Sequence, residues 1–205
     1  MAVPVVHLIT ERRLAKDLVA RVSAALAGQP PGRVAVHLRE KDLGGAALLA
    51  LARPLAAACH AAGQLLIVND RLDVALAAGR WTPSAPAAGG PPEDARRLLG
   101  PAALVGVSCH SVPDVVRARD AGASYATVSP IHDTPSKRAY GPPLGLSTLA
   151  EAARLGLPIV ALGGMSPSNA PEAYAAGAHG VAAIRAWLAG DDPVGAVRAL
   201  APAGR

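Results

Sequence analysis

Short aliphatic runs alternate along the chain with longer amphipathic stretches, and each pair takes roughly 20 to 30 residues. The aliphatic runs predict parallel strands that helices cover on both faces. We expect strands at residues 3–9, 34–38, 65–68, 80–85, 104–107, 125–128, 159–162 and 180–183, of which 80–85 has the weakest pattern. The amphipathic stretches predict helices at 15–27, 46–62, 72–78, 93–99, 112–121, 146–155, 169–176, 184–188 and 193–200.

Glycines mark the ends of several predicted helices. Gly63, Gly79, Gly122 and Gly177 each stand where a helix commonly ends in a left-handed residue. Repeated strand–helix–glycine units predict an α/β protein, and eight such units close most naturally as a (β/α)₈ TIM barrel. We therefore expect a single TIM-barrel domain over residues 1–205. The alternative is an open doubly wound sheet, but no G-x-G-x-x-G turn follows the first strand.

Composition agrees with this architecture. A length of 205 residues suits one domain near the lower size limit of such barrels. Hydrophobic residues make up 51% and Phe is absent, so we expect a core of Ala, Val, Leu and Ile. Cys59 and Cys109 lack metal-type spacing and lie in apolar contexts, which predicts buried free thiols.

The chain is basic, with a formal charge of +5. Its arginines are scattered and aromatic residues make up only 2%, which argues against nucleic-acid binding. An anionic small ligand accounts for the surplus equally well. No apolar stretch reaches the ~18 residues of a membrane span and no basic leader precedes the first strand, so we expect a cytoplasmic protein without membrane partners.

In a barrel, polar residues that follow the strands converge on one mouth. Alternation after the second strand places His37, Arg39 and Lys41 on one side, a predicted cationic group for a diphosphate; the alternative is a solvated run of charges. Asn69 and Asp70 follow the third strand. Asp70 could bind Mg²⁺ together with phosphate oxygens, or it could cap the next helix.

Further candidates follow the fifth and sixth strands. Ser108 and His110 offer a hydroxyl and a titratable ring, although the Ser111–Asp114 pattern also predicts a helix cap directly after His110. The long loop at 129–143 resembles the lids found at barrel mouths. Donors for an anion in this loop are Thr134, Ser136 and Lys137.

Gly163 and Gly164 come directly after the seventh strand, and the eighth runs through Ile184 into a short helix. Loops after these two strands form a recurrent phosphate site in barrels, where glycine lets backbone N–H groups approach the anion. The alternative reading is a tight turn that needs two glycines.

Together these motifs resemble the thiamine phosphate synthase/TenI family over nearly the whole chain. The matching stretches are HLITERR, VHLREKDL, LLIVNDRLDVALAAG, GVSCHS, SPIHDTPSK, GPPLGL, IVALGGMSPSNA and AAGAHGVAAIRA. The resemblance implies a transferase that joins 4-amino-2-methyl-5-pyrimidinylmethyl diphosphate to 4-methyl-5-(2-phosphoethyl)thiazole and releases pyrophosphate. It also implies a dissociative reaction, a need for Mg²⁺ and a homodimer.

The resemblance further implies a role for each candidate residue. Arg39, Lys41 and Asn69 would hold the pyrimidine diphosphate and Asp70 the metal. Ser108 and Lys137 would contact the departing diphosphate. The thiazole phosphate would be bound by Thr134, Ser136 and the backbone of Gly163, Gly164 and Ile184.

Some residues depart from the synthase pattern. His37 stands where synthases usually carry Gln, and Gly89 stands where they carry the Asp that is the second metal carboxylate. These features resemble the TenI branch, which includes thiazole tautomerases that use a His matching His110. Asp70 and the Thr-Pro-Ser-Lys loop resemble a synthase, whereas Arg185 fits neither pattern. The hypotheses are therefore a synthase, a tautomerase, or a non-catalytic relative that binds a phosphorylated ligand.

Overall fold

The computed structural model describes residues 2–79, 84–86, 92–134 and 142–202. Eight parallel strands form one sheet in the order β3-β2-β1-β8-β7-β6-β5-β4. The strands are β1 Val6–Ile9, β2 Val34–Leu38, β3 Leu65–Val68, β4 Ser84–Pro86, β5 Leu104–Cys109, β6 Tyr125–Val128, β7 Ile159–Leu162 and β8 Gly180–Ala183. The first and last strands are neighbours, as they are in a barrel.

The predicted α/β architecture is confirmed, but complete closure of the barrel is not. Within the described residues, β3 and β4 are the two ends of the hydrogen-bonded ladder. The expected fourth strand at 80–85 is observed as the three-residue β4, and residues 80–83 and 87–91 lie outside the described part. So short a strand offers few backbone groups for pairing.

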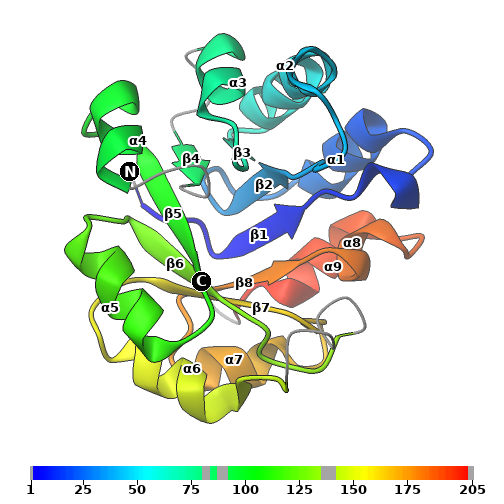
Figure 1. The fold of residues 1–205 in the computed structure, drawn as a ribbon. Coiled ribbons are helices and arrows are strands. Elements are labelled where there is room, and N and C mark those ends of the chain that lie inside the picture. Colours follow the sequence, from blue (N-terminus) through cyan, green and yellow to red (C-terminus); the bar gives the residue numbers. More distant parts are fainter. Residues whose placement is uncertain (1, 80–83, 87–91, 135–141, 203–205) are drawn as a thin grey trace.

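Helices surround the sheet (Figure 1). They are α1 Leu18–Leu26, α2 Gly45–Ala61, α3 Leu72–Ala77, α4 Pro92–Leu99, α5 Val112–Asp120, α6 Gly145–Ala153, α7 Ala170–Ala175, α8 Arg185–Leu188 and α9 Pro193–Leu200, with a 3₁₀ turn η1 at Arg12–Leu14. The first helix starts later than predicted because the Asp17 side chain accepts a hydrogen bond from the Ala20 N–H.

The predicted helix-ending glycines are confirmed by their backbone angles. Gly63, Gly79, Gly122 and Gly177 have φ values of 66°, 108°, 79° and 94°, in the backbone region that residues other than glycine rarely adopt. Each lets the chain leave a helix sharply and enter the next strand, which keeps the connections short.

The sheet packs on both faces, and alternate strand residues serve the two cores. One set packs against the helices, while the other forms an interior cluster of Ile9, Ala35, Ile67, Tyr125, Val160 and Ala182. The expectation of a purely aliphatic core is thus incomplete, because Tyr125 and Trp187 are among the largest fully buried side chains. A Cβ built on Gly106 would overlap the ring of Tyr125, so glycine makes room for this ring.

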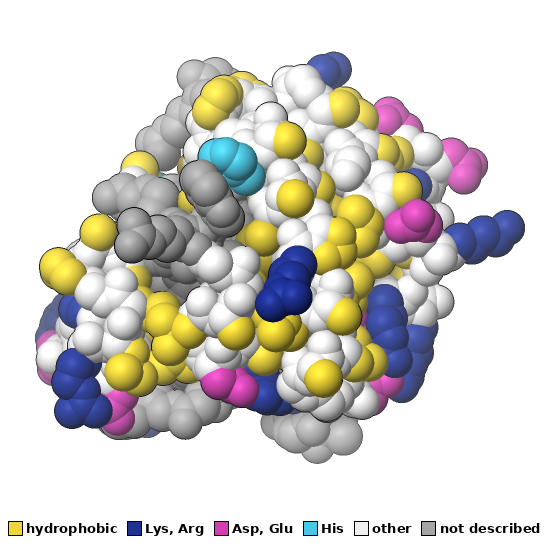
Figure 2. All heavy atoms as spheres, turned by 90° about the horizontal axis from the view of Figure 1, so that it is seen from above, with side chains coloured by type: hydrophobic (Ala, Val, Ile, Leu, Met, Phe, Trp, Pro, Cys, Tyr) yellow, Lys and Arg dark blue, Asp and Glu magenta, His cyan; other side chains and the backbone are white. Residues whose placement is uncertain are grey.

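Both cysteines are free and buried, as predicted. Burial raises the pKa of the Cys59 thiol to about 12 and that of Cys109 to about 11. Within the described part of the chain, every helix is too short or too polar to span a lipid bilayer. On the face shown in Figure 2, basic side chains are dispersed and acidic ones lie among them.

Candidate functional site

The loops after β1 and β2 are tied together by ion pairs. The Arg12 backbone N–H and Nη1 donate to Glu40 Oε1 and Oε2 at 3.0 and 3.1 Å, and the Glu40 side chain is only 1% exposed. Arg12 also binds both carboxylate oxygens of Asp42 at 2.6 Å, and Arg13 adds a contact at 2.7 Å. The hydrogen bond from Arg12 holds the pKa of Asp42 far below its usual value. The carboxylates of Glu40 and Asp42 therefore both form ion pairs with arginines of the loop after β1.

These ion pairs hold the loop that carries Arg39 and Lys41, two of the predicted diphosphate ligands. The Arg39 backbone N–H donates to Thr10 Oγ1 at 3.0 Å, which ties the start of the loop to the end of β1. Arg39 is half-buried and Lys41 is exposed. Neither side chain forms an ion pair or hydrogen bond with any described residue, so both charges are available to an anion.

The third member of the predicted cationic group is not a cation. His37 is only 3% exposed, and burial lowers its pKa from 6.5 to about 4. It points into the sheet interior, where its Nε2 lies 2.7 Å from His7 Nδ1 and its Nδ1 lies 3.3 Å from Asn69 Oδ1. The prediction that His37 contributes positive charge is therefore wrong.

His7, the hydrogen-bond partner of His37, was not among the residues predicted from the sequence. It is fully buried on β1, and its Nε2 lies 2.9 Å from the Pro4 carbonyl oxygen. Burial and the neighbouring His37 lower the pKa of His7 well below its usual value. The sequence signal that could have identified His7 is the presence of a polar residue within the aliphatic run of β1.

Asp70 lies two residues after the end of β3, and its side chain is exposed. Its φ of 61° places it in the left-handed region, and the residue that caps α3 is Arg71, whose side chain makes no capping hydrogen bond. The capping alternative for Asp70 is thus wrong. The carboxylate bonds to no other described residue. Among the described residues, no cluster of three metal-ligating side chains occurs, and Gly89 lies outside them.

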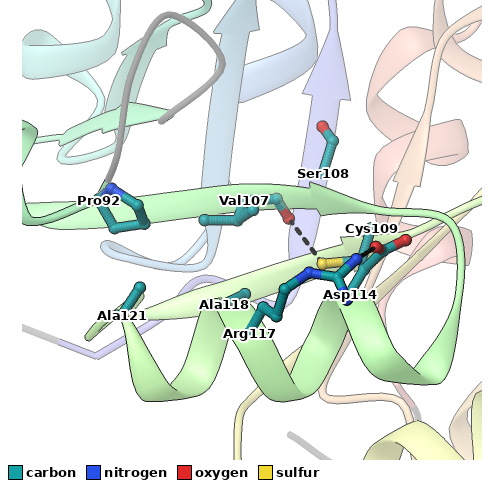
Figure 3. A pocket seen from close by; sticks show the side chains of 8 residues that line it. All are labelled: Pro92, Val107, Ser108, Cys109, Asp114, Arg117, Ala118 and Ala121. Atoms are coloured by element: carbon teal, nitrogen blue, oxygen red, sulfur yellow. Dashed lines mark hydrogen bonds and ion pairs between the residues drawn. The ribbon is translucent and has the colours of Figure 1, made fainter.

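Ser108 lies on β5 with its hydroxyl accepting a hydrogen bond from Thr127 Oγ1 at 3.3 Å. Figure 3 shows it on the side of β5 that faces away from α5. A cavity of about 230 Å³ lies beside β5 and is lined by Val107, Ser108 and Cys109 of this strand, by Pro92 and by residues of α5 and its C-terminal end.

His110 follows β5 with a defined ring orientation. Its Nδ1 donates to the Ser129 carbonyl oxygen at 2.7 Å, which leaves Nε2 as the acceptor of the neutral ring. The predicted cap is also present, because Ser111 Oγ accepts from the Asp114 N–H, and Asp114 Oδ2 accepts from the His110 N–H. The cap and a functional His110 are therefore compatible, since the cap helps to fix this residue.

Gly163 and Gly164 follow β7 with φ values of 98° and 65°. The loop after β6 packs directly against them: a Cβ on Gly163 would lie 2.7 Å from Pro130 Cα, and one on Gly164 would lie 2.8 Å from His132 Cβ. The tight-turn reading is thus correct. It does not exclude a phosphate site, because neither glycine N–H donates to a described acceptor.

Asn169 braces this turn and was not predicted. Its Nδ2 donates to the Gly164 carbonyl at 2.9 Å, and its Oδ1 accepts from the Ser166 N–H at 2.8 Å. Ile184 stands at the neighbouring end of β8, where it precedes α8. Thr134 is described and half-buried, but Ser136 and Lys137 lie outside the described residues.

The strand order brings these groups to one end of the sheet, in an arrangement that known proteins share. The family model described as thiamine monophosphate synthase matches residues 6–187. The chain belongs to this family. The resemblance inferred from its motifs is thereby confirmed, and the candidate residues between Arg39 and Ile184 lie within the matched region.

Similar proteins carry consistent names. The chain is 43% identical to a thiamine-phosphate synthase of Roseiflexus sp. (strain RS-1) over 96% of its own length and 83% of that protein. It is 42% identical to the thiamine-phosphate synthase of Roseiflexus castenholzii, covering 96% and 86%. A solved thiamine phosphate pyrophosphorylase from Pyrococcus furiosus superposes with a TM-score of 0.81 at 27% identity, covering 95% of this chain and 92% of that one.

Proposed function

We propose that this protein is a thiamine-phosphate synthase, a transferase that joins the aminopyrimidine diphosphate to the thiazole phosphate and releases pyrophosphate. Family membership and relatives of that name over nearly the full length support this activity. The observation that carries the proposal is a set of three charges in the segments that follow the neighbouring strands β2 and β3. Within the described residues, the side chains of Arg39, Lys41 and Asp70 form no ion pair or hydrogen bond. A diphosphate with a bound divalent cation complements this combination of charges.

The groups at the mouth divide between the two substrates. Arg39 and Lys41 bind the diphosphate and stabilise the negative charge that grows on it as it leaves. Asn69 contacts the pyrimidine portion, while Ser108 and Lys137 contact the departing group. The backbone N–H groups of Gly163, Gly164 and Ile184, with Thr134 and Ser136, hold the thiazole phosphate.

Asp70 suits Mg²⁺, because this ion commonly takes only one or two protein carboxylates and completes its shell with phosphate oxygens and water. When bound, the ion neutralises diphosphate charge. The glycine at position 89 makes this site depend on the substrate's own oxygens. We also propose that the complete chain closes its barrel between β3 and β4 and acts in the cytoplasm as a homodimer.

Two parallel incubations test the activity. The purified protein with both substrates and Mg²⁺ should form thiamine phosphate and equimolar pyrophosphate, and a chelator should abolish the product. Asp70→Asn should raise the Mg²⁺ concentration needed for half-maximal rate, whereas the matched control Asp73→Asn should not, because Asp73 is paired with Arg71 on the surface of α3. Absence of product from the first incubation would contradict the synthase assignment.

A thiazole tautomerase is the second candidate, and the orientation of His110 favours it. The acceptor Nε2 of this ring can take up and return a proton as a general acid–base group. The second incubation therefore contains the carboxylated thiazole phosphate tautomer alone. Aromatised product that disappears in His110→Asn would identify a tautomerase, while turnover in neither incubation would leave a non-catalytic ligand-binding protein.

A further inference from the structure

A chain of hydrogen bonds crosses the sheet interior from β1 to the mouth. It runs from the Pro4 carbonyl through His7 and His37 to the side chain of Asn69, over contacts of 2.9, 2.7 and 3.3 Å. The two histidine rings are almost fully enclosed. Because each contact needs one donor and one acceptor, the position of one proton determines all the others.

The direction of the hydrogen bonds follows from the end at the Pro4 carbonyl. A carbonyl oxygen can only accept, so His7 carries its proton on Nε2 and donates it to Pro4. In a neutral His7 the other nitrogen, Nδ1, must then accept. The facing nitrogen, His37 Nε2, therefore carries the proton that joins the rings. His37 is neutral as well, so its Nδ1 has a lone pair directed at Asn69.

A lone pair on His37 Nδ1 requires a donor from Asn69. The carboxamide oxygen and nitrogen exchange places when the group turns by 180°, and the hydrogen-bond partners decide which orientation holds. An oxygen facing the His37 lone pair would be repelled, whereas the NH₂ group would donate. The favoured orientation thus presents Asn69 Nδ2 to His37 and turns Oδ1 away from the ring.

We propose that His7 and His37 are positioning residues that fix the Asn69 carboxamide with its oxygen toward the mouth, where it accepts a hydrogen bond from the amino group of an aminopyrimidine. The choice of ligand rests on the proposed function; the hydrogen-bond direction does not. A glutamine at position 37 preserves the direction, because its NH₂ group can donate to His7 and its oxygen can accept from Asn69. Leucine at this position can do neither.

Histidine ring spectroscopy tests the direction without any assay of activity. Long-range ¹H–¹⁵N NMR distinguishes the two tautomers, and the six histidines can be assigned with single variants. At pH 7 we expect both His7 and His37 to carry the proton on Nε2. In His7→Phe the acceptor is lost, and we expect His37 to move its proton to Nδ1 and donate to Asn69. A wild-type His37 with its proton on Nδ1, or with both nitrogens protonated, would overturn the proposal.

Steady-state kinetics tests the consequence for substrate. We expect His37→Leu to raise KM for the aminopyrimidine diphosphate about tenfold, the effect of one lost hydrogen bond, and KM for the thiazole phosphate less than twofold. His37→Gln should recover most of the difference. The matched control His179→Gln removes another partly buried ring that bonds a backbone carbonyl, and should change neither constant.

Equal increases in both KM values, or no recovery in His37→Gln, would refute the positioning role. If the protein makes no thiamine phosphate, calorimetric binding of the aminopyrimidine diphosphate replaces the kinetic arm, and the same tenfold loss is expected in His37→Leu. If His7 and His37 both carry the proton on Nε2 but the protein shows no turnover, the synthase assignment is rejected and the hydrogen-bond chain is retained. If His37 carries its proton on Nδ1 instead, the proposed direction of the hydrogen-bond chain is rejected whether or not the enzyme is active.

Discussion

Mild acid should destabilise this protein through His37. Burial lowers the pKa of the ring from 6.5 to about 4, so between these values the unfolded chain binds a proton that the folded protein excludes. Stability contributed by the neutral ring is complete above pH 6.5, falls as the pH drops, and levels off below pH 4. With these two pKa values, proton linkage gives a loss of about 2 kcal/mol between pH 7.5 and 5. His7 acts in the same direction, since its pKa is lowered as well.

Urea unfolding at a series of pH values measures this effect, with His37→Gln as the control. Carboxylates also titrate near pH 5, but they do so in both proteins, so the difference between the two curves reports the contribution of His37. The wild-type protein should lose about 2 kcal/mol more than the variant between pH 7.5 and 5. Parallel curves for the two proteins would show that His37 titrates normally and would refute its enclosure as a neutral ring.

Three further changes test particular contacts. Gly106→Ala should cost about 1–3 kcal/mol in urea unfolding through overlap with Tyr125, and the cost should shrink in a Tyr125→Val background; additive effects would argue against the contact. Ser111→Ala should cost about 1 kcal/mol by removing the cap of α5, with Ser111→Thr close to wild type, whereas equal losses in both would exclude the hydroxyl. Gly164→Ala should destabilise by roughly 1–2 kcal/mol from its left-handed backbone and its contact with His132, and should raise KM for the thiazole phosphate alone; an unchanged KM would separate this turn from the phosphate site.

Local patterning was sufficient to predict most of the fold. Aliphatic runs and helix-ending glycines are properties of neighbouring residues, and the structure confirms a strand at or within each predicted run except the fourth. There the run is interrupted, and only Ser84–Pro86 forms a described strand. The η1 turn was missed because its cause is not local: Arg12 is held by Glu40 and Asp42 from the loop after β2.

Candidate site residues could be proposed from the sequence where a residue stands near the end of its own strand, but not where two residues on neighbouring strands interact. Arg39, Lys41 and Asp70 are recognisable from position alone. His7 can be recognised as part of the site only from the register of β1 and β2, which pairs His7 with Ala35 and Ile9 with His37, so that the two rings share a face and meet diagonally. The same holds for Thr127, which bonds Ser108 on the neighbouring strand. Without knowledge of the register, each of these looks like an isolated polar residue in a strand.

The ion pairs in the segments after β1 and β2 bear on the proposed site for the diphosphate. The segments after these strands carry five cations, Arg12, Arg13, Lys16, Arg39 and Lys41, and four acidic residues, Glu11, Asp17, Glu40 and Asp42. Of the acidic residues, Glu40 and Asp42 form ion pairs. Both carboxylates bind the first two arginines, and the buried Glu40 gains by being paired. Within the described residues these ion pairs leave Arg39 and Lys41 without a carboxylate partner, and the diphosphate of the proposed substrate would supply the opposite charge.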